Sequence, residues 1–230
     1  MNEKIFLAFD IDGTIYDAGD ILEEAFAEAI LLCTKQGLCK ESVLPSKESI
    51  VATLGFPIDK ICSMLFPHLP RETRDYLGQK WTENLVYLIK DKKGKLIEGV
   101  EEVIPQLFNR GYELLVASNG VRAYIEAILF TYNLTQFFSP LSLYAEGDLS
   151  NKSEIIAEYK KILKSSKIIM IGDRITDLDA ARLNNLPFIG CAFGHAGAEE
   201  ISGQKFIASK FTEILDLIES IVKSNSWFFI

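Results

Sequence analysis

The fold of this chain is decided by the stretch Phe6-Leu7-Ala8-Phe9-Asp10-Ile11-Asp12-Gly13-Thr14-Ile15. In it, an apolar run that begins at Ile5 ends in two aspartates, which a single residue separates. The run is uninterrupted rather than alternating, and this predicts a strand buried on both faces of a parallel sheet. Ligands of open α/β sheets bind at the carboxyl ends of the strands, so Asp10 and Asp12 are predicted to face a binding site.

Asp10 and Asp12 also lie close enough together to constrain each other's charge. Two such carboxylates repel unless a cation or a proton lies between them, so a metal site or an acid–base pair is expected. Asp and Gly are frequent in turns as well, and these residues alone leave an ordinary strand-to-turn boundary open.

The sequence pattern changes near residue 96. From residue 16 to 95 the apolar residues follow a helical period without a convincing strand, and helices are expected over 21–36, 46–54, 58–66 and 71–90. From residue 99 onward helices alternate with strands. Strands are expected over 113–117, 167–171, 188–190 and, more weakly, 141–144 and 205–208; helices are expected over 100–109, 121–132, 151–163, 178–184 and 211–223.

These repeated strand–loop–helix units imply right-handed crossovers and a parallel sheet. We therefore predict an α/β fold with a doubly wound, Rossmann-like parallel sheet as its core, built from residues 1–15 and 96–230. Residues 16–95 are predicted to form an inserted, all-helical cap domain.

Composition narrows the function classes. The chain has 230 residues, of which 48% are hydrophobic and 24% charged, as expected for a globular protein with a sizeable core. Its formal charge of −8 argues against nucleic acid as a partner, because phosphate backbones are bound by basic faces. No apolar stretch is long enough for a signal peptide or a membrane span. Four cysteines without a Cys-x-x-Cys pair indicate reduced thiols, and a cytoplasmic location is expected.

Polar residues follow three of the predicted strands. They are Asp10 and Asp12, then Ser118 and Asn119, then Asp173 and Asp177, while Lys152 opens a helix between the second and third groups. In a parallel sheet these strand ends lie along one edge, so the side chains are predicted to converge. Carboxylates, a hydroxyl, an amide and a lysine suit a phosphoryl group held together with Mg²⁺. Taken singly, Ser118 with Asn119 is better explained as an ordinary turn, Lys152 as a solvated lysine and Asp177 as a carboxylate in the first turn of a helix.

In type, order and spacing these groups resemble the four motifs of the haloacid dehalogenase superfamily. The motifs are Asp10-Ile11-Asp12-Gly13-Thr14, Ser118, Lys152, and Gly172-Asp173 with Asp177. The resemblance covers essentially the whole chain, and the helical insert lies where that family has its type 1 cap. Residues 172–190, followed by 193–201, are further similar to the phosphoglycolate phosphatase-like branch. Ser153 follows the lysine, where the family commonly has proline.

The resemblance implies a role for each of the carboxylates that begin and end the motif set. Asp10 would attack phosphorus and form an aspartyl-phosphate. Asp12 would protonate the leaving alcohol and then activate the water that hydrolyses this intermediate. Asp10, Asp173 and the backbone carbonyl of Asp12 would hold Mg²⁺.

The remaining motif residues are implied to bind the phosphoryl group or to support those that do. Ser118 and the backbone amide of Asn119, in the turn that ends at Gly120, would bond its oxygens. Lys152 would neutralise the developing charge, and Asp177 would orient Lys152 or a metal-bound water. Thr14 would fix its loop through a bond from its hydroxyl to the backbone.

Substrate choice is expected to come from the cap, because the core residues all address phosphate and metal. The turn Thr53-Leu54-Gly55-Phe56-Pro57 is the candidate that faces Asp10, with Phe56 shaping the leaving-group side. An ordinary turn between two helices explains the same residues equally well. A second anionic group of the substrate would find cations among Lys47, Lys60, Arg71 and Arg74.

The expected function is that of a Mg²⁺-dependent phosphatase acting on a small phosphorylated metabolite, with phosphoglycolate as the substrate that the branch suggests. Asp12 argues against a dehalogenase, because a halide needs no proton to leave. A phosphomutase of the same architecture and a non-catalytic binding protein with this fold remain alternatives. The oligomeric state is not predicted. His195 follows a core strand and is a weaker site candidate, and residues 227–230 are expected to pack in the core or in an interface.

Overall fold

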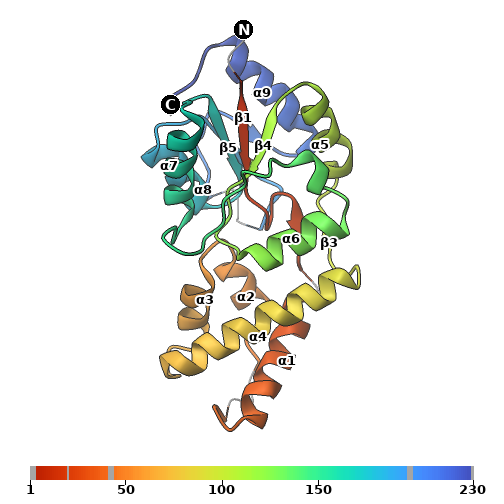
Figure 1. The fold of residues 1–230 in the computed structure, drawn as a ribbon, viewed down its shortest axis with the longest axis vertical. Helices are drawn as coiled ribbons and strands as arrows, with labels where there is room; N and C mark the ends of the chain where they lie inside the picture. Colours follow the sequence, from red (N-terminus) through yellow and green to blue (C-terminus); the bar gives the residue numbers. More distant parts are fainter. Residues whose placement is uncertain (1–3, 20, 41–43, 196–198, 229–230) are drawn as a thin grey trace.

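The computed structural model describes residues 4–19, 21–40, 44–195 and 199–228. The molecule is elongated and has two parts, a sheet with its covering helices and a group of helices at one end (Figure 1). The predicted class, an α/β fold around a parallel sheet, is confirmed.

The central sheet has five strands in the order β4-β1-β5-β6-β7. Their bounds are Phe6–Phe9 for β1, Glu113–Val116 for β4, Ile168–Gly172 for β5, Phe188–Cys191 for β6 and Ile207–Ala208 for β7. Every pairing is parallel, and Phe9 lies opposite both Val116 and Ile171. Because β4, β1 and β5 are neighbours and in register, the loops that follow them begin side by side.

Each face of the sheet is covered by helices. One hydrophobic cluster contains Phe6 and Ala8 with residues of α7 (Lys152–Leu163) and α8 (Ile175–Leu183). The other contains Leu7 and Phe9 with residues of α5 (Val100–Asn109), α6 (Arg122–Thr131) and α9 (Ile214–Lys223). Alternate residues of β1 therefore enter opposite cores, which is why its sequence is apolar throughout. Two short 3₁₀ helices, Thr135–Phe137 and Phe211–Glu213, complete this part.

The strand expected over 141–144 is absent, and this prediction was wrong. Next to β4, Leu114 forms an isolated bridge with Phe138. The amide of Val116 then donates to the hydroxyl of Ser142, at 3.2 Å, instead of to a backbone carbonyl. The side chain of Ser142 thus accepts the hydrogen bond that the edge of β4 offers, and residues 141–144 need not adopt a strand conformation.

The inserted helices are α1 (Ile21–Lys35), α2 (Lys47–Thr53), α3 (Ile58–Leu65) and α4 (Arg71–Lys90). The long helices α1 and α4 pack against each other at the end of the molecule (Figure 1), and Phe26 stacks on Trp81 with ring centroids 4.1 Å apart. Ser46 caps α2 by accepting a hydrogen bond from the amide of Ser49. These helices bury their apolar faces against one another and against α6.

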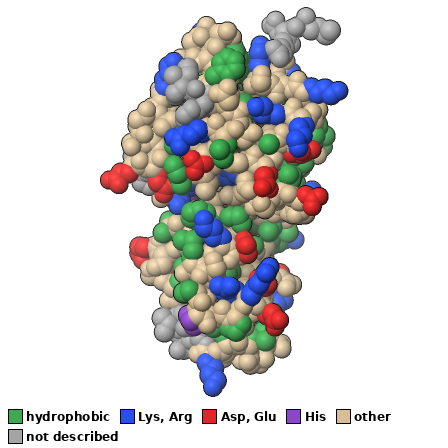
Figure 2. All heavy atoms as spheres, turned by 90° about the vertical axis from the view of Figure 1, so that its left-hand side faces the viewer, with side chains coloured by type: hydrophobic (Ala, Val, Ile, Leu, Met, Phe, Trp, Pro, Cys, Tyr) green, Lys and Arg blue, Asp and Glu red, His purple; other side chains and the backbone are tan. Residues whose placement is uncertain are grey.

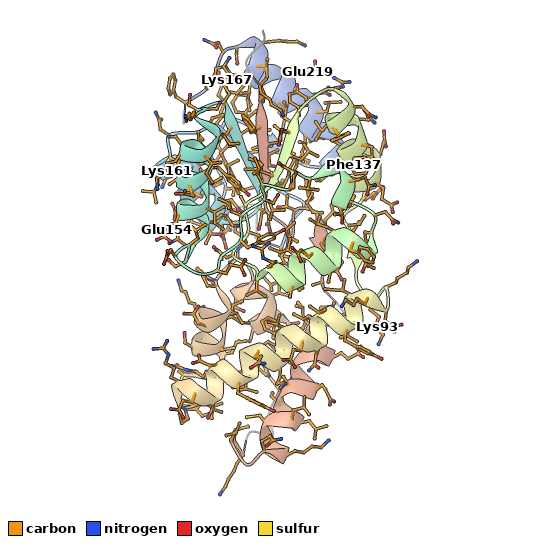
Figure 3. All side chains as sticks on the ribbon, viewed as in Figure 1. Lys93, Phe137, Glu154, Lys161, Lys167 and Glu219 are labelled. Atoms are coloured by element: carbon orange, nitrogen blue, oxygen red, sulfur yellow. The ribbon has the colours of Figure 1, made fainter. Side chains whose placement is uncertain are left out.

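Two short strands join the parts, where the sequence pattern indicated none between residues 16 and 95. Tyr16–Asp17 (β2) and Lys95–Leu96 (β3) pair antiparallel. Strands of two residues are too short to show a period of two in the sequence. The hydroxyl of Tyr16 adds a bond, at 2.8 Å, to the carbonyl of Lys93, which is labelled in Figure 3. We propose that this strand pair marks the boundary between the core and the inserted helices.

The surface and the helices agree with the composition. On the face drawn in Figure 2, basic and acidic side chains are interspersed instead of gathering by sign. In the described ranges, no helix combines the length and the hydropathy that crossing a bilayer requires.

Candidate active site

The ends of the neighbouring strands β4, β1 and β5 bring the predicted polar residues together. Asp10 directly follows β1, Ser118 comes two residues after β4, and Asp173 directly follows β5. The first residue of α7, Lys152, and the third of α8, Asp177, reach the same place. All these side chains are nearly inaccessible to solvent, together with those of Thr14 and Asn119.

Lys152 lies between two carboxylates. Its Nζ is 3.0 Å from Oδ1 of Asp10 and also donates to Oδ1 of Asp177. Burial works against its charge, but Asp10 and Asp177 outweigh that effect and hold the pKa of Lys152 above its usual range. Asp177 is fixed in turn, because its Oδ2 accepts from the amide of Arg174 at 2.9 Å. Lys152 is thus a permanent positive charge held beside Asp10.

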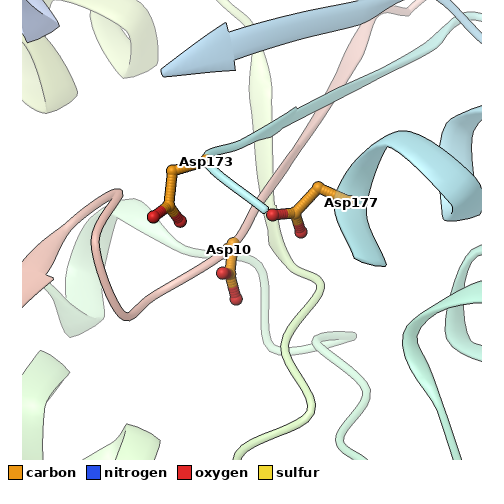
Figure 4. A group of neighbouring side chains, drawn as sticks. All are labelled: Asp10, Asp173 and Asp177. Atoms are coloured by element: carbon orange, nitrogen blue, oxygen red, sulfur yellow. The ribbon is translucent and has the colours of Figure 1, made fainter. Parts of the chain in front are cut away.

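Three carboxylates converge at this point, as Figure 4 shows. Asp10, Asp173 and Asp177 each offer an oxygen, and these oxygens lie within 4.8 Å of one another. Asp173 accepts from the hydroxyl of Thr14 at 3.3 Å and from the amide of His195 at 2.8 Å. The predicted bond from the Thr14 hydroxyl to the backbone was therefore wrong, because this buried hydroxyl bonds to the carboxylate instead. A Cβ at residue 13 would overlap the Asp173 carboxylate, so this packing needs Gly13, whose φ is +78°.

The residues present fit a divalent cation. Oδ2 of Asp10 is buried, and among the described residues it has no hydrogen-bond partner. Buried polar atoms rarely lack a partner, and three carboxylates face a single lysine here. Mg²⁺ takes a few carboxylate oxygens together with water and substrate oxygens. The cluster contains Asp10 and Asp173 of the predicted ligand set, and it adds Asp177.

Asp12 is held by a residue that the sequence did not single out. The hydroxyl of Tyr124, in α6, donates to Oδ1 of Asp12 at 2.6 Å. Burial raises the pKa of Asp12 to about 7, although the bond from Tyr124 acts in the opposite direction. Tyr124 lies on an apolar helix face, where a tyrosine resembles any core aromatic residue, so no local sequence signal marked it.

The turn after β4 contacts the inserted helices. Ser118 accepts a bond from the amide of Gly120 at 3.3 Å, as in a common hydroxyl-stabilised turn. The side-chain amide of Asn119 donates to the carbonyl of Gly55 at 2.7 Å. Asn119 therefore links the strand end to the turn between α2 and α3, which contains Phe56.

Arg174 holds the same turn from the other side and was also missed. Its guanidinium donates to the carbonyls of Leu54 and Ala52, and its Nε donates to Glu200 at 3.1 Å. The side chain is buried although it is charged. The candidate turn 53–57 thus lies against the strand ends, as the sequence predicted.

A pocket lies between this turn and the strand ends. It is bordered by Asp12, Tyr124 and the turn Ser118–Gly120 on one side and by Phe56 and other apolar residues of the inserted helices on the other. The four cations considered from the sequence, Lys47, Lys60, Arg71 and Arg74, do not line it. Lys60 instead lies over the ring of Phe56, 3.9 Å from its centroid.

The sequence also singled out His195 and the C-terminal residues 227–230. The His195 side chain is mostly buried, and burial lowers its pKa; its Nε2 is 3.8 Å from Asp17, while its backbone supports Asp173. Residues 196–198 of the branch-like segment lie outside the described residues. Trp227 is buried, which agrees with core packing, but Phe228 is 62% exposed and does not pack in the core; Phe229 and Ile230 also lie outside the described residues.

Comparison with known proteins agrees with this geometry. The family model of haloacid dehalogenase-like hydrolases matches residues 7–191. The "Probable phosphatase IndB" of Dickeya dadantii is 23% identical, with 97% of each chain covered. A phosphoglycolate phosphatase of Pectobacterium atrosepticum is 25% identical over 92% of this chain and 91% of its own. The crystal structure of a predicted phosphatase from Clostridium acetobutylicum has a TM-score of 0.75 at 23% identity, covering 96% of this chain and 99% of its own, and it shows the shared fold.

Proposed function

The chain belongs to the haloacid dehalogenase-like hydrolases, and on that basis we propose that it is a Mg²⁺-dependent phosphatase that cleaves a small phosphomonoester through an aspartyl-phosphate intermediate. One observation carries the proposal. Asp10 is buried with one oxygen on Lys152 and the other without a hydrogen-bond partner among the described residues. Such a carboxylate suits both a nucleophile and a metal ligand.

In the first step, the carboxylate of Asp10 attacks phosphorus and the bond from phosphorus to the leaving oxygen breaks. That oxygen takes a proton from Asp12, so the alcohol leaves neutral. Burial, which raises the pKa of Asp12 to about 7, supports this role because it keeps a proton available near neutral pH. Tyr124 supports it by fixing the orientation of the carboxyl group.

In the second step, Asp12 is a carboxylate and takes a proton from water. The water oxygen attacks phosphorus, the bond to Asp10 breaks, and inorganic phosphate is released. Asp10 regains its charge and Asp12 regains its proton, so the cycle closes without another reactant. The same residue thus acts first as acid and then as base.

The remaining residues bind and neutralise the phosphoryl group. Ser118 and the backbone amide of Asn119 donate to its oxygens, and Lys152, held by Asp177, balances the charge that develops on them. Asp10, Asp173 and the backbone carbonyl of Asp12 would hold Mg²⁺, with Asp177 beside them. The cation supplies positive charge that reduces the repulsion between the Asp10 carboxylate and the substrate.

The cellular setting that we propose is the cytoplasm. All four cysteines are buried and free, which supports a reducing compartment. The proposed partner is a small phosphorylated metabolite, and phosphoglycolate, which names the activity of the Pectobacterium relative, belongs in any substrate panel.

The test is phosphate release from p-nitrophenyl phosphate and from a panel of phosphomonoesters, with and without Mg²⁺. We expect turnover that requires the metal and is abolished in Asp10→Asn, since an amide is a poor nucleophile. Release of inorganic phosphate distinguishes a phosphatase from a phosphomutase, because a mutase leaves the phosphoryl group on its product. Turnover that persists in Asp10→Asn would contradict the proposal.

A further inference from the structure

The pocket beside Asp12 indicates what kind of alcohol leaves. Resting on the phosphatase function proposed above, we infer that the substrate is a phosphomonoester of an uncharged alcohol with an apolar body and a neutral oxygen, and not of one that carries a carboxylate.

The position of the pocket identifies its occupant. Asp12, the residue that would protonate the leaving oxygen, borders it together with Tyr124. The turn Ser118–Gly120, which would hold the phosphoryl oxygens, forms another edge. A phosphoryl group on Asp10 therefore directs the rest of the ester into this space. The residues that line the pocket belong in part to α3, α4 and α6.

On the side of the inserted helices the lining is mainly apolar, and no described residue of the lining is a cation. The inserted helices and the turn between α2 and α3 supply mainly leucine, isoleucine and aromatic side chains, such as Leu54, Phe56, Ile61 and Leu85. Among the described residues that line the pocket, no lysine, arginine or histidine occurs, and Asp12 is the ionisable carboxylate. A carboxylate on the leaving group would be buried without a counterion and beside a group of the same sign.

Cations close to the pocket are bound elsewhere. Lys60 lies over the ring of Phe56 and does not line the pocket. Arg174 donates to Leu54, Ala52 and Glu200. Lys152 lies between Asp10 and Asp177. To pair with a carboxylate in the pocket, each would have to give up these contacts.

One donor in the lining lacks an acceptor. The side chain of Trp81 is 2% exposed, and its indole N–H has no hydrogen-bond partner within the described residues. The neighbouring Thr82 already donates its hydroxyl to the carbonyl of Gly78 at 2.9 Å. Buried N–H groups normally find an acceptor, and an uncharged oxygen of the alcohol would supply one. This donor accounts for the neutral oxygen in the inferred substrate.

Two substrates that differ in charge and little else test the inference. Phosphoglycolate and its amide, phosphoglycolamide, have nearly the same size, but the first carries a carboxylate. We expect kcat/KM for the amide to exceed that for phosphoglycolate at least tenfold. Equal values, or a preference for phosphoglycolate, would overturn the inference.

The p-nitrophenyl phosphate assay separates this failure from failure of the proposed function. Suppose that the wild type turns over p-nitrophenyl phosphate, that Asp10→Asn does not, and that phosphoglycolate is preferred to its amide. This outcome would support the phosphatase function and contradict the inference about the leaving group. No turnover of any ester would contradict both the proposed phosphatase function and the inference about the leaving group.

A charge added to the pocket gives the converse test. Thr82→Lys places an ammonium group in the lining, and we expect it to raise kcat/KM for phosphoglycolate about tenfold relative to the amide. Gln79→Lys adds the same charge to the same helix at an exposed position outside this lining, and the ratio should stay unchanged. If Thr82→Lys folds, as judged by its melting curve, and leaves the ratio unchanged, the pocket does not hold the leaving group and the inference falls.

Trp81→Phe tests the neutral oxygen. A smaller aromatic ring remains and the N–H is lost, so we expect kcat/KM for phosphoglycolamide to fall several-fold more than kcat/KM for phenyl phosphate, which has no second oxygen on its alcohol. An equal loss for both esters would remove the indole donor from the account.

Discussion

At the scale of single residues, the site depends on how its charges are held. Tyr124 affects the proposed reaction only through its hydrogen bond to Asp12, so it is a positioning residue. Its hydroxyl donates to Oδ1 of Asp12 at 2.6 Å. The bond restrains the rotation of the carboxyl group, which borders the pocket in which the leaving alcohol would lie.

Tyr124→Phe should affect esters according to how much their leaving group needs a proton. We expect kcat to fall about tenfold for an alkyl phosphate, which corresponds to about 1.4 kcal/mol, as for one hydrogen bond. For p-nitrophenyl phosphate the loss should be smaller, because that leaving group is stable as an anion.

Tyr159→Phe is the matched control for this variant. It also loses a buried hydroxyl, which donates to the carbonyl of Val116 at 2.6 Å and accepts from the amide of Leu143 at 2.5 Å, but it has no bond to Asp12. In Tyr159→Phe, kcat for the alkyl phosphate and kcat for p-nitrophenyl phosphate should change by the same factor. If Tyr124→Phe likewise slows both esters equally, Tyr124 has only a structural role.

Asp12 should also give the metal-free protein a pH-dependent stability. Burial raises its pKa to about 7, whereas an unfolded chain has a value of about 3.9. Between these values the folded state holds a proton that the unfolded state releases, so the free energy of unfolding falls as the pH rises from about 4 to about 7. Urea unfolding in EDTA at pH 5 and pH 7.5 should show a smaller fall for Asp12→Asn than for the wild type. Identical falls would contradict the raised pKa.

At this scale the sequence predicted the residues that follow strands. Asp10, Ser118 and Asp173 could be placed because buried apolar runs end at a known edge of the sheet. Tyr124 and Arg174 could not, since their roles depend on contacts with residues 112 and 120 positions away. Neither type of residue is unusual at its place in the sequence.

At the scale of elements, the connection between the core and the inserted helices, formed by β2 and β3, is closely packed. β2 pairs with β3, and Gly94 lies beside the ring of Tyr16 with a φ of +79°. A Cβ at residue 94 would overlap the phenol oxygen of Tyr16, whose hydroxyl bonds to Lys93. Gly94 is therefore required by its backbone conformation and by its neighbour.

Gly94→Ala should destabilise the protein by about 2–4 kcal/mol, since it adds overlap with Tyr16 to the cost of a left-handed conformation. Gly111→Ala is the matched control. Gly111 has a similar φ of +84°, but nothing lies within 4 Å of its added Cβ, so we expect a cost of only about 1 kcal/mol. Urea unfolding measures both variants, and equal costs would show that the contact with Tyr16 is unimportant.

Long elements were predictable and short ones were not. The helix expected over 71–90 is α4 at the same bounds, because twenty residues show several helical turns. β2 and β3 have two residues each, and no periodicity can reveal them. The segment 141–144 has the composition of a strand, but a bond to the side chain of Ser142 replaces the ladder there.

At the scale of the whole molecule, the core contains a cluster of buried carboxylates. Asp10, Asp173 and Asp177 repel one another, and Lys152 compensates for only part of this charge. The family was predictable because its motifs lie at strand ends along the whole chain. The leaving group was not, because the pocket is assembled from helices whose relative packing the sequence does not reveal.

Mg²⁺ should therefore stabilise the fold as a whole. Saturation at about a hundred times the dissociation constant adds about 2.7 kcal/mol to the free energy of unfolding. We expect the melting temperature to rise with Mg²⁺ in the wild type and to stay nearly constant in Asp173→Asn. Asp179→Asn, which removes an exposed carboxylate of α8, should respond as the wild type does. A full response in Asp173→Asn would remove that residue from the metal ligands.

The most direct test of the central claim is to trap the phosphoryl group on the chain. Asp12→Asn cannot supply the base for the second step, so the enzyme should accumulate the intermediate when mixed with p-nitrophenyl phosphate and Mg²⁺. Acid quenching, proteolysis and mass spectrometry should locate one phosphoryl group on Asp10, and Asp10→Asn should carry none. A phosphoryl group on another residue, or product formation in Asp12→Asn without any phosphorylated protein, would contradict the mechanism.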